Sequence, residues 1–491
     1  MKKLFPLTAA LALASLLLAG CWDRREINDL AFVMALGIDK GSRPGTFIFT
    51  AQVAVPSEFA ASRGQGGGGD RGSPLPPVWI TSVEGESLMD ARRRLAEWGP
   101  RRDYYAHAEV VVLGEELARQ GIAEVLDFLQ RHPEVRRTSH LFVAEGTAQS
   151  ILQAHPRLDP IPGMAVRSLV RWSPLAGTAQ PVTLQEALCM LFTGRTQLVL
   201  PRLALTTALE QPPGQAKPTD AQGGNTSEGG ANTSEGSSSD GRREKGGKGP
   251  AKEAGEGAPP KPHGSELRLM GGAVFKGDRL VGWLDRRETR GYMWIRGQKH
   301  GGITIVSPTP APPGRASIEI IRGRARLVPE LVSGRLRMRV QVKEEGNVVE
   351  SMAPLDFTKA ELVRSLERRT ATAIRGEIMA ALQRAQKEYR SDIFGFGAAV
   401  YRRYPGLWRQ IEQDWDRIYP DLEVVVEVTS RIRRTMQTYQ GLPLSSSPPQ
   451  PEQRQGGQTQ REGQKSGSSP HQGRSGQGGI SSPSARGGTR P

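Results

Sequence analysis

The sequence predicts a mixed α/β (α+β) fold in several domains, with β-sheets packed against helices. Apolar or alternating segments, such as 30–38 and 47–55, are interspersed with segments of helical periodicity, such as 87–98. Chains with this alternation bury one face of each element against another layer. Apolar residues nearly vanish over 206–265 and again over 442–491. These stretches cannot offset the entropy of ordering, so we expect a disordered linker and a disordered tail.

Residues 21–205 are expected to form an N-terminal mixed α/β domain. Residues 47–55 alternate between apolar and polar side chains, which is typical of a half-buried strand. Ser87 can cap a helix whose predicted inner face carries Leu88, Ala91, Leu95 and Trp98. We expect strands at 30–38, 47–55, 78–83, 107–114 and 139–144, and helices at 87–98, 115–129, from 147 onward and over 183–192.

A middle β-rich region over 266–310 and a C-terminal α/β domain over 311–441 are expected after the linker. The pair Gly277-Asp278 favours a tight turn between two strands within 267–284. Apolar residues at helical spacing predict a long helix over 358–389. Further strands are expected at 303–306, 318–321, 335–342 and 422–432. Five aromatic residues are expected in the core, with an interface role as the alternative: Trp283, Tyr292, Trp294, Trp408 and Trp415.

Positive charge dominates the chain, with 66 Lys and Arg against 51 Asp and Glu, a net charge of +15. Such an excess favours anionic lipid headgroups or an acidic partner. Scattered arginines, as at 92–94 and 101–102, are also typical of a solvated face. We expect no nucleic-acid binding, because the sequence has no basic motif with interleaved aromatics.

The sequence carries no motif that indicates catalysis. Its seven histidines are dispersed, and it has neither an H-E-x-x-H nor a C-x-x-C pair, so we expect no metal site. Residues 395–397 begin like a dinucleotide loop, but Val400 stands at the third glycine position. Of the two cysteines, Cys189 has leucines at helical spacing around it and is predicted to be a small core residue. We therefore expect a protein that is not an enzyme.

Residues 1–20 have the layout of a secretory signal peptide. After Lys2 and Lys3, the apolar run over 4–18 is shorter than the roughly 20 residues that span a bilayer. Leu18, Ala19 and Gly20 then precede Cys21, an order that resembles the lipobox of bacterial lipoproteins. That resemblance implies that a diacylglycerol is attached to the Cys21 thiol and that the chain is cleaved before Cys21. We expect no cofactor apart from this lipid. The alternative is an ordinary signal or an uncleaved anchor with a chance cysteine.

Three longer stretches, at 21–40, 272–297 and 391–408, together resemble one family. The first reads CWDRREINDLAFVMALGIDK, the second contains GYMW, and the third begins SDIFGFG. In these stretches and their order, the chain resembles the Ger(x)C lipoproteins, the C subunits of spore-germination nutrient receptors. It departs from that family in its long linker, in the glycine loop at 64–69 and in its long tail.

The resemblance implies a membrane-anchored, non-enzymatic receptor subunit that supports nutrient sensing and the triggering of germination. It implies two protein partners, a multi-spanning membrane subunit and a large receptor subunit. It also implies a place on the outer face of the cytoplasmic (inner spore) membrane, held by the lipid. The alternative is an extracytoplasmic solute-binding lipoprotein of a transporter, which would need a deep interdomain cleft. A cell-wall hydrolase would need a catalytic signature that the sequence lacks.

The residues directly after the predicted lipid are expected to contact headgroups or a partner subunit. Trp22 has the amphipathic ring that favours a membrane interface. The four residues that follow it can form ion pairs with a partner: Asp23, Arg24, Arg25 and Glu26. The alternative is that this segment is a spacer or packs on its own domain.

Overall fold

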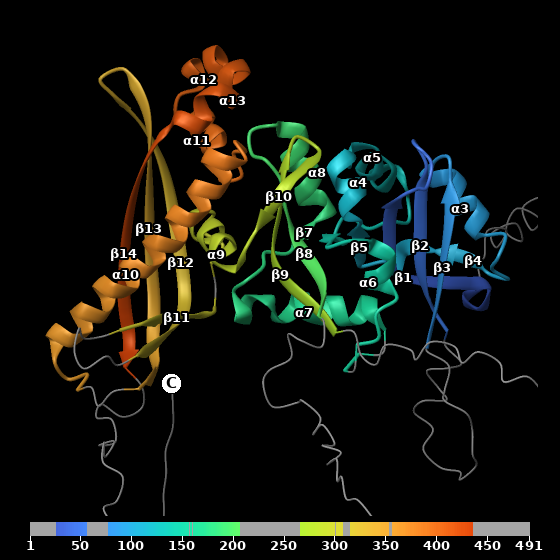
Figure 1. Cartoon of the computed structure of the whole chain (residues 1–491), viewed down its shortest axis with the longest axis horizontal. Helices are drawn as coiled ribbons and strands as arrows, with labels where there is room; N and C mark the ends of the chain where they lie inside the picture. Colours follow the sequence, from blue (N-terminus) through green and yellow to red (C-terminus); the bar gives the residue numbers. More distant parts are fainter. Residues whose placement is uncertain are drawn as a thin grey trace, which may run out of the picture. The chain divides into compact units, whose positions relative to one another are not determined.

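The computed structural model describes residues 26–55, 77–156, 158–159, 161–206, 266–299, 301–307, 315–352 and 356–435. Two β-sheets with helices packed against them make up this part of the chain, which confirms the predicted fold class (Figure 1). The predicted signal peptide, the linker beyond Thr206 and the tail lie outside the described residues. No helix in the described ranges has the length and apolar content to cross a bilayer.

The first sheet has ten strands, in the order β10-β9-β8-β6-β5-β1-β2-β3, with β4 beside β1 and β7 beside β6. Its centre is parallel (β1, β5, β6 and β8), whereas the strands at both ends pair antiparallel. The central strand β5 is short and wholly apolar, because both of its faces are covered. The strands are β1 Leu30–Lys40, β2 Phe47–Ala54, β3 Val78–Gly85, β4 Arg102–Tyr104, β5 Val110–Leu113, β6 His140–Ala144, β7 Val182–Thr183, β8 Val199–Thr206, β9 Glu266–Lys276 and β10 Arg279–Leu284.

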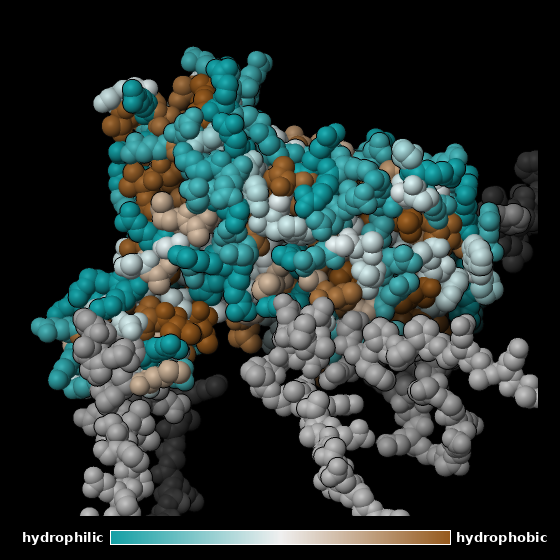
Figure 2. Space-filling model, viewed as in Figure 1, coloured by the Kyte–Doolittle hydropathy of each residue, from teal (hydrophilic) through white to brown (hydrophobic). Residues whose placement is uncertain are grey.

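Helices cover both faces of the first sheet. Four of them pack into one apolar core: α3 Leu88–Leu95, α4 Glu115–Gln120, α5 Ala123–Arg131 and α8 Leu184–Thr193. Two others, α6 Ala148–Leu152 and α7 Pro162–Ala176, pack on the opposite face. Hydrophobic side chains also reach the surface in separate patches, some of them beside α7 (Figure 2).

Three local predictions for this region are wrong. Trp98 is 71% exposed, because α3 ends at Leu95 and only the first three predicted inner residues are buried. The strand predicted from 107 begins at Val110, after a short 3-10 helix at Tyr105–His107. The helix predicted over 115–129 is two helices, because Gly121 between them has φ +139° and a Cβ there would lie 2.5 Å from the Asp278 carboxylate.

The second sheet has four strands in the order β11-β12-β13-β14. Its long central hairpin is antiparallel, and β14 runs parallel to β13. The helix α10 covers this sheet and continues into a π-helical turn at Gln383–Glu388, so the predicted long helix is confirmed. The elements are β11 Ile303–Val306, β12 Ala316–Val332, β13 Arg335–Ser351, β14 Glu423–Thr435, α9 Arg286–Ile295, α10 Ala360–Leu382, α11 Phe396–Arg403, α12 Pro405–Ile411 and α13 Trp415–Ile418.

The region predicted as a separate middle unit, 266–310, is divided between the two sheets. β9 and β10 extend the first sheet, whereas β11 is the edge strand of the second. β9 pairs antiparallel with β8, and Thr206 lies opposite Glu266. The segment 207–265 therefore connects two neighbouring strands of one sheet and does not separate two halves of the molecule.

The two sheets are joined by buried contacts. The Tyr389 hydroxyl donates to the Trp283 carbonyl oxygen at 2.9 Å, and the Ser391 hydroxyl donates to the Phe275 carbonyl oxygen at 2.6 Å. The Lys299 ammonium is fully buried and donates to the carbonyl oxygens of Gly177 and Gly301 at 2.8 and 2.9 Å. This lysine holds the C-terminus of α7 against the segment that leads into β11, and burial lowers its pKa to about 7.

Gly291 lies where α9 crosses α10, and we expect Gly291→Ala to destabilise the fold. A Cβ at this position would lie 2.0 Å from the backbone carbonyl oxygen of Glu377 and 2.8 Å from Ala381 Cβ. The two helices would have to separate, so we expect a loss of about 2 kcal/mol in the free energy of unfolding, measured by urea denaturation.

Gly376→Ala is the matched control for this crossing. Its Cβ would approach only Arg287 Nη2, at 3.2 Å, which is the far end of a flexible side chain. Alanine favours a helix over glycine, so stability should rise by about 0.5 kcal/mol. Equal effects of the two substitutions would contradict the account of the crossing.

Candidate functional site

Most residues of the predicted site lie outside the described part of the chain. These are Leu18, Ala19, Gly20, Cys21, Trp22, Asp23, Arg24 and Arg25. Glu26 is the first described residue; it is exposed and precedes a single 3-10 turn, Ile27–Asp29, that leads into β1. Whether the predicted contact residues meet lipid or a partner stays a prediction.

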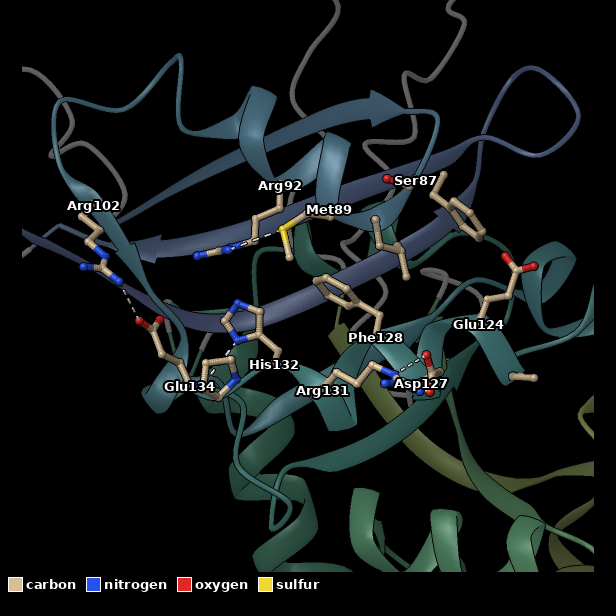
Figure 3. Close-up of a pocket in the computed structure, with 14 residues that line it drawn as sticks. Ser87, Met89, Arg92, Arg102, Glu124, Asp127, Phe128, Arg131, His132 and Glu134 are labelled. Carbon is tan, nitrogen blue, oxygen red and sulfur yellow. Dashed lines mark hydrogen bonds and ion pairs between the residues drawn. The ribbon is translucent and has the colours of Figure 1, made fainter.

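A candidate site is a groove of about 740 Å³ between α3 and α5 (Figure 3). One side of it is apolar and comes from Phe47, Leu88, Met89 and Phe128. Charged side chains surround this apolar strip, namely Arg92, Arg102, Glu124, Asp127, Arg131 and Glu134, with His132. The groove lies where α3 and α5 pack on the same face of the sheet, next to the edge-to-face contact of the Phe49 and Phe128 rings.

Most charges at the groove are paired within it. Arg131 donates to Asp127 at 2.8 Å, and Arg102 lies 3.4 Å from Glu134. The Arg131–Asp127 pair is exposed, whereas in the other pair Arg102 is exposed and Glu134 is partly buried. Exposed ion pairs contribute about 0–1 kcal/mol each to stability. They set the polarity of the groove and do not hold the fold together.

Arg92 differs from Arg102 and Arg131 in its contacts. Its guanidinium lies over the Tyr105 ring at 5.1 Å, and its buried Nε has no hydrogen-bond partner in the described structure. Burial raises the pKa of Tyr105 and of Asp103, whose carboxylate accepts from the Tyr105 hydroxyl at 3.4 Å. Burial, reinforced by Arg92, lowers the pKa of His132, so this imidazole is neutral at pH 7.

This arrangement is suited to binding. An apolar strip beside an incompletely bonded arginine can accommodate a group that carries both an apolar body and a carboxylate. Within the described ranges, no three His, Cys, Asp or Glu side chains are placed to hold a metal ion. The solvated face predicted for the arginines at 92–94 does not include Arg92, which is partly buried. Helical spacing could have marked Arg92 as lying at the boundary next to Ala91 and Leu95.

Cys189 is exposed on α8, so its prediction as a core residue is wrong. Leu184, Ala187 and Leu188 form the buried face of this helix, and Cys189 is one residue beyond it. Its sulfur accepts from the Gln185 side chain at 3.2 Å.

The stretch at 391–408 has a structural role in the core. Asp392 accepts hydrogen bonds from the backbone N–H groups of Gly395, Phe396 and Gly397 at 2.7–3.0 Å. It also accepts from the Trp415 indole at 3.0 Å, and Trp408 packs 5.3 Å from that indole. The carboxylate thus starts α11 and ties it to α13.

The predicted core aromatics are largely confirmed. Tyr292, Trp294, Trp408 and Trp415 are buried, and Trp283 is partly buried at the junction of the sheets. The stretches at 272–297 and 391–408 therefore owe their aromatic residues mainly to packing.

Comparison with known proteins places both sheets in one family. A family model described as "Spore germination protein N-terminal domain" matches residues 23–205. A second, "Spore germination B3/ GerAC like, C-terminal", matches residues 270–436. The two ranges include nearly every described strand and helix.

Several Bacillus subtilis (strain 168) proteins are similar over most of their length. Spore germination protein KC is 28% identical over 434 residues, which cover 87% of this chain and 95% of that protein. Spore germination protein B3 is 23% identical and covers 85% and 94%. A solved structure, the crystal structure of the GerBC protein, is 15% identical with a TM-score of 0.46 and covers 84% of this chain and 99% of that one. With both family models matched in order, this chain belongs to the Ger(x)C family of spore germination proteins.

Proposed function

We propose that this protein is a lipid-anchored, non-enzymatic subunit of a spore germinant receptor, in which it supports nutrient sensing and the triggering of germination. The observation that carries the proposal is the position of Cys21. It follows Leu-Ala-Gly directly and stands two residues before the family match begins at 23. Two acyl chains on that thiol would anchor the protein firmly, because each buried CH₂ contributes about 0.8 kcal/mol.

The proposed partners are a multi-spanning membrane subunit and a large receptor subunit, together with membrane lipid. The proposed place is the outer face of the cytoplasmic (inner spore) membrane. The relatives reported above are spore germination proteins by name, which supports a receptor role and not the alternative of a solute-binding lipoprotein. We propose no cofactor apart from the covalent diacylglycerol on Cys21.

Deletion of the gene in the source organism tests the receptor role. We expect spores to lose the response to at least one nutrient germinant, while germination by a non-nutrient trigger is retained. Loss of refractility and release of spore ions are the readouts. Unchanged germination by every nutrient, in spores that lack the related receptors, would refute the proposal.

Cys21→Ala tests the anchor separately. We expect the variant to keep its signal peptide and to lose incorporation of labelled diacylglycerol, because no thiol remains to accept it. The measurement is metabolic lipid labelling, with Cys189→Ala as the matched control. Cys189 is the other cysteine of the chain and is exposed, so its loss should leave labelling unchanged. Equal labelling of Cys21→Ala and the wild type would show that lipid is attached elsewhere.

A further inference from the structure

A hollow of about 370 Å³ lies between the strand β12 and the helix α11, which are neighbours in Figure 1. Three arginines line it, Arg326 from β12 and Arg402 and Arg403 from α11. The rest of its lining is uncharged and consists of Leu327, Val328, Pro329 and Ala399. No acidic side chain is among the described residues that line it. In this it differs from the groove at Arg92, where arginines and carboxylates are equal in number.

The hollow belongs to the packed body of the second sheet. Ala399 and Val400 of α11 are buried in the same apolar cluster against which Leu327 of β12 packs. The helix ends directly after these residues, where the Tyr404 N–H donates to the Val400 carbonyl oxygen at 2.7 Å. Arg402 and Arg403 therefore come from the last turn of a helix that is fixed to the strand carrying Arg326.

The three arginines of the hollow form no ion pair with any described residue. Arg403 Nε donates to the Tyr404 hydroxyl at 3.2 Å, and its guanidinium carbon lies 5.5 Å from the centre of that ring. This contact orients the guanidinium and leaves its two terminal nitrogens without a described hydrogen-bond partner. Arg326 and Arg402 are exposed at the same hollow. Charged donors are thus present here without an acceptor.

The segments that contribute these arginines contain no acidic residue. Residues 320–329 of β12 include three arginines, and residues 396–411, which form α11 and α12, include another three, with no Asp or Glu in either range. Glu330 follows the first range directly, but it accepts from Arg337 and Arg339 at 2.8 and 2.7 Å. The uncompensated charge at the hollow is therefore positive, which favours an anionic ligand.

The edge of β12 beside the hollow is unsuited to pairing with another strand. β11 pairs with β12 only over Ala316–Glu319. Farther along the same edge, the Gly323 N–H donates to the Lys299 carbonyl oxygen at 2.9 Å. Backbone groups alternate between the two edges of an antiparallel strand, so Pro329 faces this edge as well. Proline has no N–H to offer a further strand, which favours a small ligand over an extended peptide.

The chemistry of the arginines indicates which anion fits. Each guanidinium presents a planar fork of donors that matches a carboxylate or a phosphate. A single carboxylate has two oxygens and one negative charge. A phosphate monoester has three free oxygens and a charge of about −1.5 to −2 at pH 7, so it can accept from more than one guanidinium. The uncharged lining, with Leu327, Val328 and Ala399, suits the neutral body to which such a phosphate is attached.

We propose that the hollow between β12 and α11 binds a phosphate monoester group through Arg326, Arg402 and Arg403. The ligand joins the strand to the end of the helix. This site is independent of the lipid on Cys21 and goes beyond the receptor role proposed above. The same phosphate group occurs on soluble esters and on the headgroup of phosphatidic acid, and the two sources are separated by experiment.

Calorimetric titration with inorganic phosphate tests the site, using the mature chain with Cys21→Ser in about 0.15 M chloride so that unspecific charge effects are screened. We expect saturable binding. Arg326→Gln and Arg402→Gln should each raise the dissociation constant about tenfold, because each removes a charged fork of donors. Arg402→Lys keeps the charge without the fork and should raise it about threefold. Both positions are exposed, so the urea transition should stay unchanged.

Arg136→Gln is the matched control. Arg136 is exposed in the segment between α5 and β6, forms no described ion pair, and gives the same change in net charge. We expect less than about a twofold effect, since it belongs to the first sheet and distant exposed charges are screened. If Arg136→Gln and Arg402→Gln weaken phosphate binding equally, net charge attracts the anion and the proposal is overturned.

Vesicles of phosphatidylcholine with and without phosphatidic acid form the second arm. Binding that requires phosphatidic acid, is lost in Arg402→Gln and is displaced by inorganic phosphate would support the site and identify a lipid headgroup as its ligand. Phosphate binding without vesicle binding would support it with a soluble ester as the ligand. Absence of binding in both arms would overturn the proposal. So would vesicle binding that Arg326→Gln and Arg402→Gln leave unchanged.

Discussion

Asp392→Ala is expected to lower the free energy of unfolding by about 4 kcal/mol, more than any other single change considered for this chain. The carboxylate is buried and accepts four hydrogen bonds, three from the backbone at the start of α11 and one from Trp415. Alanine would leave these four donors buried without an acceptor. It would also remove the connection between α11 and α13.

Urea denaturation measures this effect, and Asp421→Ala is the control. Asp421 lies in the same part of the chain, is 86% exposed, and approaches Lys387 only at 4.0 Å. Its loss should change stability by less than about 0.5 kcal/mol. Asp392→Asn keeps one acceptor oxygen and should fall between the two. A loss below about 1 kcal/mol for Asp392→Ala would show that water or other groups replace the carboxylate.

Glu344→Gln is expected to stabilise the protein at neutral and alkaline pH by up to about 3 kcal/mol. Glu344 lies on β13, faces α10 and is 1% exposed. Neither of its carboxylate oxygens forms a hydrogen bond of ordinary geometry in the described structure, although the Ser430 hydroxyl and the Arg431 amide of β14 face it. Burial raises the pKa of this carboxyl to about 7, and the charges of Glu345 and Glu367 add to the shift.

The direction of the pH dependence follows from this shift. The folded state binds the proton with a pKa of about 7, whereas the usual value is 4.5. The favourable contribution is therefore complete below about pH 4.5 and is lost as the pH rises through 7. The variant and the wild type should have similar stability near pH 4.5, and the variant should be more stable above about pH 7. Urea denaturation across this range provides the measurement.

Glu345→Gln is the control at the neighbouring residue, whose pKa is shifted in the opposite direction. Hydrogen bonds from Arg433 and Arg322 lower the pKa of Glu345 to about 2. Its contribution is present above about pH 4.5 and is lost as the pH falls towards 2, so this variant should not change the slope between pH 5 and 8. If Glu344→Gln has the same slope as the wild type there, its carboxyl is ionised in the folded protein.

Local periodicity was sufficient to predict the elements whose apolar residues follow a single regular spacing. β2 alternates, α3 has its apolar residues on one side, and α10 keeps its stripe over six turns, so each was predicted. α7 was not assigned, because its exposed side carries Met164, Trp172 and Leu175 as well as arginines, and Pro174 interrupts the pattern. Hydrophobic periodicity assumes that apolar residues are buried, so it does not detect a helix that also has apolar residues on its exposed side.

Other features depend on residues that are far apart in the sequence. The break between α4 and α5 is placed by Asp278, which contacts Gly121 from the β9–β10 turn. The assignment of β9 to one sheet and β11 to the other depends on strand pairing, which the apolar pattern does not specify. The groove at Arg92 likewise requires α3 and α5 to be adjacent. By contrast, the family was predictable from short motifs, because these contain residues such as Asp392 and Gly291 whose geometry tolerates little change.

The pairing of Thr206 with Glu266 has a consequence for how this chain tolerates changes in length. Because β8 and β9 are adjacent and the Thr206 hydroxyl donates to the Glu266 carbonyl oxygen at 2.7 Å, the ends of the intervening segment are fixed beside each other. The cost of closing such a connection grows only with the logarithm of its length, by about 0.6 kcal/mol for each doubling. A fluorescent reporter or an affinity tag can therefore be inserted between these strands without moving one sheet relative to the other. Relatives are free to differ in length here while they keep the same body.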